Sequence, residues 1–380
     1  MGFDQFAGNP RIVTALRRML ERERVPHAML FTGHRGVGRY TLAVLFAQAA
    51  NCERLQDDSC GECDTCRRIG RLADPEPLVE QGLAERGENP DSGMIERVPL
   101  ILETHPDVWA LVPDPVRRNR PAARPVIRMG QLRAAQRAAY FVPVARRRVF
   151  ILDSAETMRW DYANIFLKIL EEPPETATFI LLAPRPEDML PTIRSRAVTF
   201  RFAPLPTAEV EEFLEKRSSL EPGERKLAAA LSEGSPGEAL RIDLKESVRL
   251  REEVVQLLAL SFENRSWSEV LALCNQLTKS GAARFENVLE LLYSVLTDLL
   301  YIRCGFKGRF PHYSDPQGRL EGLSRRVTLG QVRTMMESLD RLSAGLRRNI
   351  NRELSLEAAL VGWANAEKRV QPDRRSAPRQ

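Results

Sequence analysis

Four cysteines in the first fifth of the chain have the spacing of a metal site. They are Cys52, Cys60, Cys63 and Cys66. The pattern C-x7-C-x2-C-x2-C, with Gly61 easing the turn, lets four thiolates converge on one tetrahedral zinc ion. Because sulfur would fill all four positions, the predicted zinc site is structural and leaves no place for a reacting water. Cys274 and Cys304, in contrast, are interpreted as scattered core cysteines.

A glycine-rich segment before these cysteines has the pattern of a phosphate-binding loop with altered chemistry. A working loop reads G-x-x-x-x-G-K-[S/T], in which backbone amides hold phosphates, the lysine contacts the β- and γ-phosphates and the hydroxyl binds magnesium. The candidate nucleotide-binding residues here are Gly33, Gly36, Gly38, Arg39, Tyr40 and Thr41. Arg39 replaces the lysine and Tyr40 replaces the hydroxyl residue, while Thr41 comes one residue too late. We therefore expect ATP binding to be impaired; a chance glycine-rich turn is the alternative.

A second candidate position follows the strand at residues 148–152. ATP hydrolysis needs one carboxylate for magnesium and another group that positions the attacking water. Asp153 has the type required for the first role, but Ser154 occupies the place of the second and is not a base at neutral pH without an activating neighbour. Glu156 is better explained as an acidic residue at a helix start.

The elements that must position these residues alternate between strands and helices. Short apolar runs predict strands at residues 28–31, 107–112, 148–152, 177–182 and 198–202. Helical patterns lie at residues 131–140 and 156–172, and a first helix is indicated by Asn9 as N-cap and Pro10. This alternation predicts an α/β fold with a parallel sheet covered on both faces. Residues 72–103 show no clear period and are interpreted as a surface insertion.

Strand signals stop after Pro204, and the rest of the chain is helical. Short helices are predicted at residues 208–217, 225–232 and 236–242, followed by long amphipathic helices at 248–260, 267–278, 285–303, 329–346 and 351–366. We expect an α/β domain over residues 1–204, a small helical domain over 205–244 and an all-α domain over 245–367. The basic, proline-containing end, residues 368–380, is predicted to be a disordered tail.

Composition is that of an ordinary globular protein. The chain has 380 residues, of which 43% are hydrophobic and 28% charged, with a mild net charge of +5. This charge is compatible with nucleic acid or an acidic partner but proves neither. Without a signal peptide or a long apolar run, the chain is expected in the reducing cytoplasm, where disulfides are disfavoured.

Several motifs, in order, resemble the bacterial clamp-loader subunits of the AAA+ class. They are FLKILEEPP at 166–174, LPTIRSR at 190–196, HPD at 105–107, GSPGEAL at 234–240 and NRELSLE at 351–357. The resemblance covers nearly the whole chain, and the cysteine cluster matches it too. It implies an AAA+ domain with a zinc module, a helical lid and a helical collar that mediates oligomerisation.

Departures from this family's motor subunits indicate which branch the chain resembles. Arg39, Ser154, Ala183-Pro184 and Gly237 stand where motor subunits hold or sense nucleotide, whereas Ser195-Arg196 is intact apart from Ala197 in place of cysteine. The pattern resembles the stationary delta-prime branch. It implies a non-hydrolysing member of a hetero-pentameric ring with gamma/tau-type ATPases and delta, which loads the sliding clamp of DNA polymerase III onto primed DNA.

In that setting Arg196 is implied as an arginine finger that acts on the nucleotide of a neighbouring subunit, with Arg194 as a competitor. Two alternatives stay open. One is an ATP-hydrolysing gamma/tau-type subunit. The other is a zinc-stabilised DNA-binding protein with a vestigial nucleotide fold, whose phosphate contacts would come from Arg67, Arg68 and Arg71.

Overall fold

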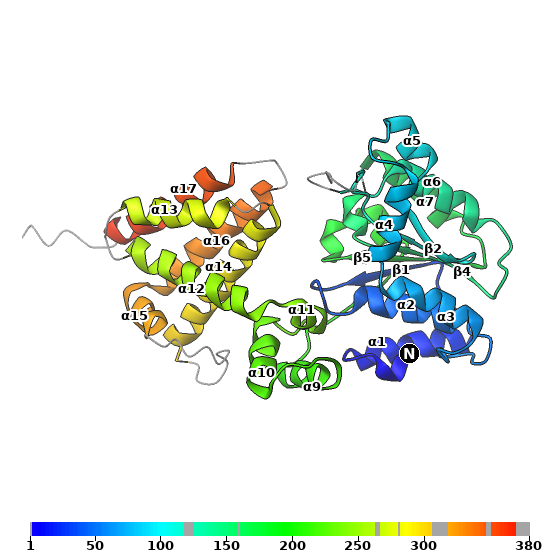
Figure 1. Cartoon of the computed structure of the whole chain (residues 1–380), viewed down its shortest axis with the longest axis horizontal. Helices are drawn as coiled ribbons and strands as arrows, with labels where there is room; N and C mark the ends of the chain where they lie inside the picture. Colours follow the sequence, from blue (N-terminus) through cyan, green and yellow to red (C-terminus); the bar gives the residue numbers. More distant parts are fainter. Residues whose placement is uncertain are drawn as a thin grey trace, which may run out of the picture. The chain divides into compact units, whose positions relative to one another are not determined.

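The chain forms two compact units in a computed structural model. The units comprise residues 1–241 and 242–380. The structure describes residues 2–117, 125–158, 160–262, 267–279, 282–305, 318–346 and 351–369 (Figure 1). The predicted tail lies outside these residues from 370 onward. None of the helices within them combines the length and apolar character needed to cross a bilayer.

The first unit is built on a six-stranded sheet with the order β2-β3-β4-β5-β1-β6. The strands are β1 (Ala28–Thr32), β2 (Ile101–His105), β3 (Val108–Leu111), β4 (Arg148–Leu152), β5 (Ala177–Ala183) and β6 (Val198–Arg201). Strands β3, β4, β5, β1 and β6 are parallel, whereas β2 runs antiparallel to β3 at one edge. The predicted α/β class is confirmed, with one antiparallel edge strand that the sequence analysis did not anticipate.

Both faces of the sheet are buried, which explains why its central strands are uniformly apolar. Alternate residues point to opposite faces, so Met29 and Phe31 enter one core while Ala28 and Leu30 enter the other. The first core is covered by α1 (Pro10–Glu21), α2 (Arg39–Ala50) and α3 (Asp64–Gly70), and the second by α6 (Met129–Ala139) and α7 (Trp160–Glu171). Single turns are η1 (Phe3–Gln5), η2 (Arg71–Ala73), η3 (Ala155–Thr157), η4 (Pro186–Asp188) and α8 (Pro191–Arg194).

Residues 72–103 are more regular than their sequence indicates. They form α4 (Glu76–Glu85), α5 (Ser92–Arg97) and most of the edge strand β2. A buried ion pair, in which Arg86 Nη1 lies 2.9 and 2.8 Å from the two carboxylate oxygens of Asp114, fastens the segment to the sheet domain. This segment is therefore packed against the domain by a few long-range contacts, which leave no periodic pattern in its sequence.

Asn9 is the N-cap residue of α1 and Pro10 is its first residue, as predicted. Asn9 O accepts from Ile12 N at 2.9 Å, but the backbone of Asn9 is left-handed at φ 51° and its side chain makes no cap hydrogen bond. Instead Asn9 Nδ2 donates to Ala203 O at 3.1 Å, and Ala203 N donates to Asn9 Oδ1 at 2.9 Å. A long-range backbone partner has replaced the local one, and it joins the start of α1 to the end of β6.

Three short helices complete the first unit. They are α9 (Thr207–Arg217), α10 (Pro222–Leu231) and α11 (Pro236–Arg241), which we call the lid helices. They pack on one another around buried Val210, Leu214 and Ala228. The segment Gly234–Glu238, which begins α11, lies against the glycine-rich loop that follows β1.

The second unit is a bundle of helices. They are α12 (Leu244–Phe262), α13 (Trp267–Thr278), α14 (Ala282–Arg303), α15 (Arg319–Arg326), α16 (Leu329–Leu346) and α17 (Arg352–Arg369). Their apolar faces form one core, which contains a buried ion pair between Arg251 of α12 and Asp298 of α14. All but α15 were predicted from their amphipathic pattern; α15 is short and its composition is dominated by polar residues.

Candidate functional site

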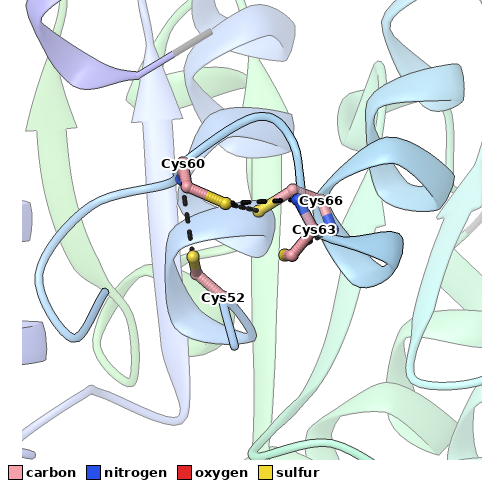
Figure 2. Close-up of side chains that lie close together, drawn as sticks. All are labelled: Cys52, Cys60, Cys63 and Cys66. Atoms are coloured by element: carbon pink, nitrogen blue, oxygen red, sulfur yellow. Dashed lines mark hydrogen bonds between the residues drawn. The ribbon is translucent and has the colours of Figure 1, made fainter. Parts of the chain in front are cut away.

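The four predicted cysteines converge in space (Figure 2). Their Sγ atoms all lie within 4.8 Å of one another, and those of Cys60 and Cys66 are 4.0 Å apart. A tetrahedron with metal–sulfur bonds of about 2.3 Å has sulfur–sulfur edges of about 3.8 Å, so the thiolates fit one metal ion with little movement. The cluster can therefore hold a metal ion.

Backbone amides around the cluster donate hydrogen bonds to its sulfur atoms. The amide of Cys60 donates to Cys52 Sγ at 3.4 Å, that of Cys63 to Cys60 Sγ at 3.3 Å and that of Cys66 to Cys63 Sγ at 3.4 Å. Amides of Cys63 and Glu62 lower the pKa of Cys60 to about 6, whereas burial raises the pKa of Cys66. Donors aimed at sulfur stabilise the charged form that binds metal.

The three glycines of the loop after β1 are packed against other parts of the chain. A side chain on Gly33 would lie 2.8 Å from Phe202 O, and one on Gly38 would lie 2.8 Å from the ring of Phe6. At Gly36, where φ is +76°, it would lie 2.7 Å from Glu238 Cγ. In a phosphate loop such glycines let the backbone approach the phosphates. Here the same freedom serves close packing within the protein.

The contact between the loop and the lid helices is specific. Gly237 N donates to Gly36 O at 2.9 Å, and Arg35 pairs with Glu238 at 3.3 Å. Gly237 is the position at which the resemblance implies an arginine in motor subunits. A side chain built on Gly237 would lie 3.0 Å from Gly36 O, so this close approach favours glycine at position 237.

We expect Gly36→Ala to destabilise the first unit by about 1–3 kcal/mol, because alanine is strained at a positive φ and its methyl group would strike Glu238. Chemical denaturation followed by circular dichroism measures the change. Gly223→Ala is the matched control: a Cβ at Gly223 has open space within α10, so alanine there should be neutral or stabilising. Equal stability of the two variants would contradict the packing role of Gly36.

Arg39 and Tyr40, which replace the lysine and the hydroxyl residue of a phosphate loop, interact with other residues of the first unit. Tyr40 packs against the first core and its hydroxyl donates to Leu72 O at 2.9 Å. Burial lowers the pKa of Arg39, opposed by the negative charges of Asp153 and Glu156. Burial likewise raises the pKa of Asp153, opposed by the positive charge of Arg39. Thr41 is exposed at the start of α2.

Glu156 lies in η3 rather than at the start of α7. Burial raises its pKa to about 6, and within the described residues its Oε2 atom has no hydrogen-bond partner. It lines a cavity of about 130 Å³ with Asp188, Met189 and Pro191, among others. This cavity lies next to α8, the turn that precedes Arg196.

The candidate finger Arg196 lies apart from the glycine-rich loop and is partly exposed. Its Nη1 donates to Thr192 O at 3.1 Å and its Nη2 pairs with Glu171 Oε1 at 2.8 Å. The side chains of Arg196 and Glu171 are 36% and 53% exposed. The guanidinium therefore points along the surface from α8 to the end of α7.

Sequence reasoning missed several residues that shape these sites. Phe6 covers Gly38 and Glu171 pairs with Arg196, although nothing in the sequence pattern connects either pair. Glu171 belongs to the LEEPP motif that carries the resemblance, and this was the one available signal for it. Arg67 and Arg68 are exposed on α3, and Arg68 pairs with Asp64 at 2.8 Å, as expected of a solvated helix face.

Comparison with known proteins assigns the chain to a family. A profile described as DNA polymerase III, delta subunit matches residues 8–206, and one described as DNA polymerase III, delta subunit, C terminal matches residues 245–365. The chain belongs to the DNA polymerase III delta subunit family. The resemblance drawn from the motifs is confirmed.

Individual relatives of this family member differ in length. The DNA polymerase III subunit delta' of Pseudomonas aeruginosa is 29% identical over 90% of this chain and 93% of its own. The subunit tau of Escherichia coli is 29% identical over 63% of this chain. The matched region covers 32% of the length of tau. A solved DNA polymerase III gamma subunit-related protein from Thermotoga maritima is 18% identical, with 93% of this chain and 99% of that one covered and a TM-score of 0.38.

Proposed function

We propose that this chain is a non-hydrolysing, delta-prime-type subunit of a DNA polymerase III clamp loader. In this role it supports loading of the sliding clamp onto primed DNA, within a hetero-pentameric ring in the cytoplasm that also contains gamma/tau-type ATPases and delta. The relative matched over nearly its full length carries the delta' name, whereas tau extends far beyond the region matched.

One observation carries the non-hydrolysing part of the proposal. The Tyr40 hydroxyl, at the position of the magnesium-binding hydroxyl, donates to Leu72 O, and the lid segment is held against the loop by the bond from Gly237 N to Gly36 O. ATP would find no lysine and no magnesium hydroxyl in place at this loop. A serine at position 154 removes the group that positions water.

The same proposal gives Arg196 a role in trans and the cysteine cluster a zinc ion. Arg196 is exposed enough to reach a neighbouring subunit once its pair with Glu171 exchanges for phosphate oxygens. Four cysteine thiolates at this spacing favour zinc over harder cations. In this reading Cys52, Cys60, Cys63 and Cys66 hold one structural zinc, which stabilises the fold and supplies no catalysis.

The isolated chain is expected to show no ATP turnover above the rate of a buffer blank. Arg39→Lys should not restore it, because the missing magnesium hydroxyl and Ser154 remain. Phosphate release measures turnover, and equilibrium dialysis with ATP measures binding. Steady hydrolysis by the purified chain that disappears in Asp153→Ala would overturn the proposal and favour the motor-subunit alternative.

A further inference from the structure

The loop between α6 and β4, residues 140–147, presents apolar side chains to solvent. Its exposed fractions are 57% for Tyr140, 65% for Phe141, 85% for Val142 and 77% for Val144. A loop with apolar side chains this exposed would gain free energy by collapsing onto the protein, so other contacts must hold its backbone in this conformation.

One end of the loop is fastened to residues at the start of the cysteine segment. Asn51 Oδ1 accepts from Arg146 N at 3.1 Å and from Arg147 N at 2.8 Å. Arg146 Nη2 donates to Leu55 O at 2.6 Å. Asn51 is 2% exposed, so these are buried acceptor contacts and their loss would leave polar groups unsatisfied.

The rest of the loop is fastened to the sheet and does not involve the cysteines. Asp107 Oδ2 accepts from Ala145 N at 2.6 Å, and Arg148 Nε donates to Phe141 O at 2.9 Å. Asp107 is buried and Arg148 begins β4. Arg147 Nη1 also donates to Glu175 O at 3.2 Å and to Thr178 Oγ1 at 3.1 Å. Only the amides of Arg146 and Arg147 and the side chain of Arg146 are therefore attached through the cysteine segment.

Asn51 and Leu55 lie on either side of the first metal ligand. Asn51 is the C-cap of α2, Cys52 follows it directly, and Cys52 Sγ accepts from Leu55 N at 3.4 Å. A metal bound by Cys52 fixes this short stretch to Cys60, Cys63 and Cys66. Without it, the stretch keeps the bonds of the last turn of α2, in which Asn51 Nδ2 donates to Ala47 O at 3.2 Å and Cys52 N to Ala49 O at 3.3 Å, and beyond Cys52 only weak N–H···S contacts.

We infer that metal binding at the four cysteines holds the C-terminal half of the 140–147 loop in place through Asn51 and Leu55. The cluster then does more than stabilise its own segment: its occupancy fixes Arg146 and Arg147, the last two residues of the exposed loop. This inference does not depend on the proposed clamp-loading role.

Hydrogen–deuterium exchange with single-amide resolution tests the inference on the full chain, zinc-loaded and after chelation. The amides of Arg146 and Arg147 should exchange roughly tenfold faster or more without zinc, because their acceptor is released. The amides of Ala145 and Val149, which bond to Asp107 at 2.6 and 2.8 Å, are internal controls and should be unchanged. The inference would be overturned if the amides of Arg146 and Arg147 exchanged at the same rate in both states. It would also be overturned if removal of zinc raised the exchange rate of Val149 as much as theirs.

Asn51→Ala separates the loop from the metal. It should retain one zinc per chain, because Asn51 is no ligand, yet show the fast exchange at Arg146 and Arg147 even when zinc-loaded. Asn51→Asp keeps an acceptor oxygen at this position and should restore protection. Cys304→Ser, which changes an exposed cysteine outside the cluster, should behave as the unaltered chain. Protection that persists in zinc-loaded Asn51→Ala would refute the route through Asn51.

Discussion

Replacement of Arg196 by alanine is expected to lower ATP hydrolysis at the neighbouring site of the reconstituted complex by about three to five orders of magnitude. An arginine that reaches the γ-phosphate stabilises the charge that develops in the transition state, and no other group at a preorganised site compensates for its loss. The other ATPase sites of the complex would still hydrolyse ATP and hide this loss in the total turnover. Hydrolysis at the neighbouring site is therefore measured with the other ATPase subunits inactivated. Clamp loading on primed DNA is the second readout.

Folding and assembly should survive this substitution. Arg196 and Glu171 are both substantially exposed, and exposed ion pairs contribute at most about 1 kcal/mol. Arg194→Ala is the matched control, since Arg194 lies in the same turn two residues earlier. Its effect on hydrolysis should be much smaller. A complex with Arg196→Ala that hydrolyses ATP and loads clamps at the unaltered rate would refute the finger role.

Loss of one cysteine ligand should have the second largest effect, on the stability of the first unit. We expect Cys63→Ser to lose metal and to lower the melting temperature of this unit by about 5–15 °C, as follows from a loss of several kcal/mol in a domain of this size. Cys63 is the N-cap of α3 and Cys66 lies within that helix, so a metal bound by the four cysteines would join α3 to the end of α2.

Metal analysis and differential scanning calorimetry measure these effects. The unaltered chain should contain about one equivalent of zinc, and Cys304→Ser should match it in metal content and melting temperature. Because the ligands bind as thiolates, metal should also be released as the pH falls. A zinc content well below half an equivalent in chain purified without chelators would contradict the zinc assignment.

The convergence of the four cysteines could be predicted from their local sequence. Four ligands within a fifteen-residue segment, Cys52 to Cys66, bring one another close in almost any compact arrangement, so their spacing alone predicted convergence. The central strands were predicted for a similar reason. Strands buried on both faces are apolar at nearly every position, and β1, β4 and β5 each contain a short continuous apolar run.

The sequence also determined which chemical groups are missing from the phosphate loop, since Arg39, Tyr40 and Ser154 are read directly from it. Only the tertiary structure decided which partners Gly36, Asn9 and Asn51 contact. Gly36 contacts the lid helices some two hundred residues later, the Asn9 side chain bonds to Ala203, and the Asn51 side chain bonds to the loop at Arg146. These contacts form between segments distant in the chain, where spacing carries no information and the packing of the whole unit selects the partner.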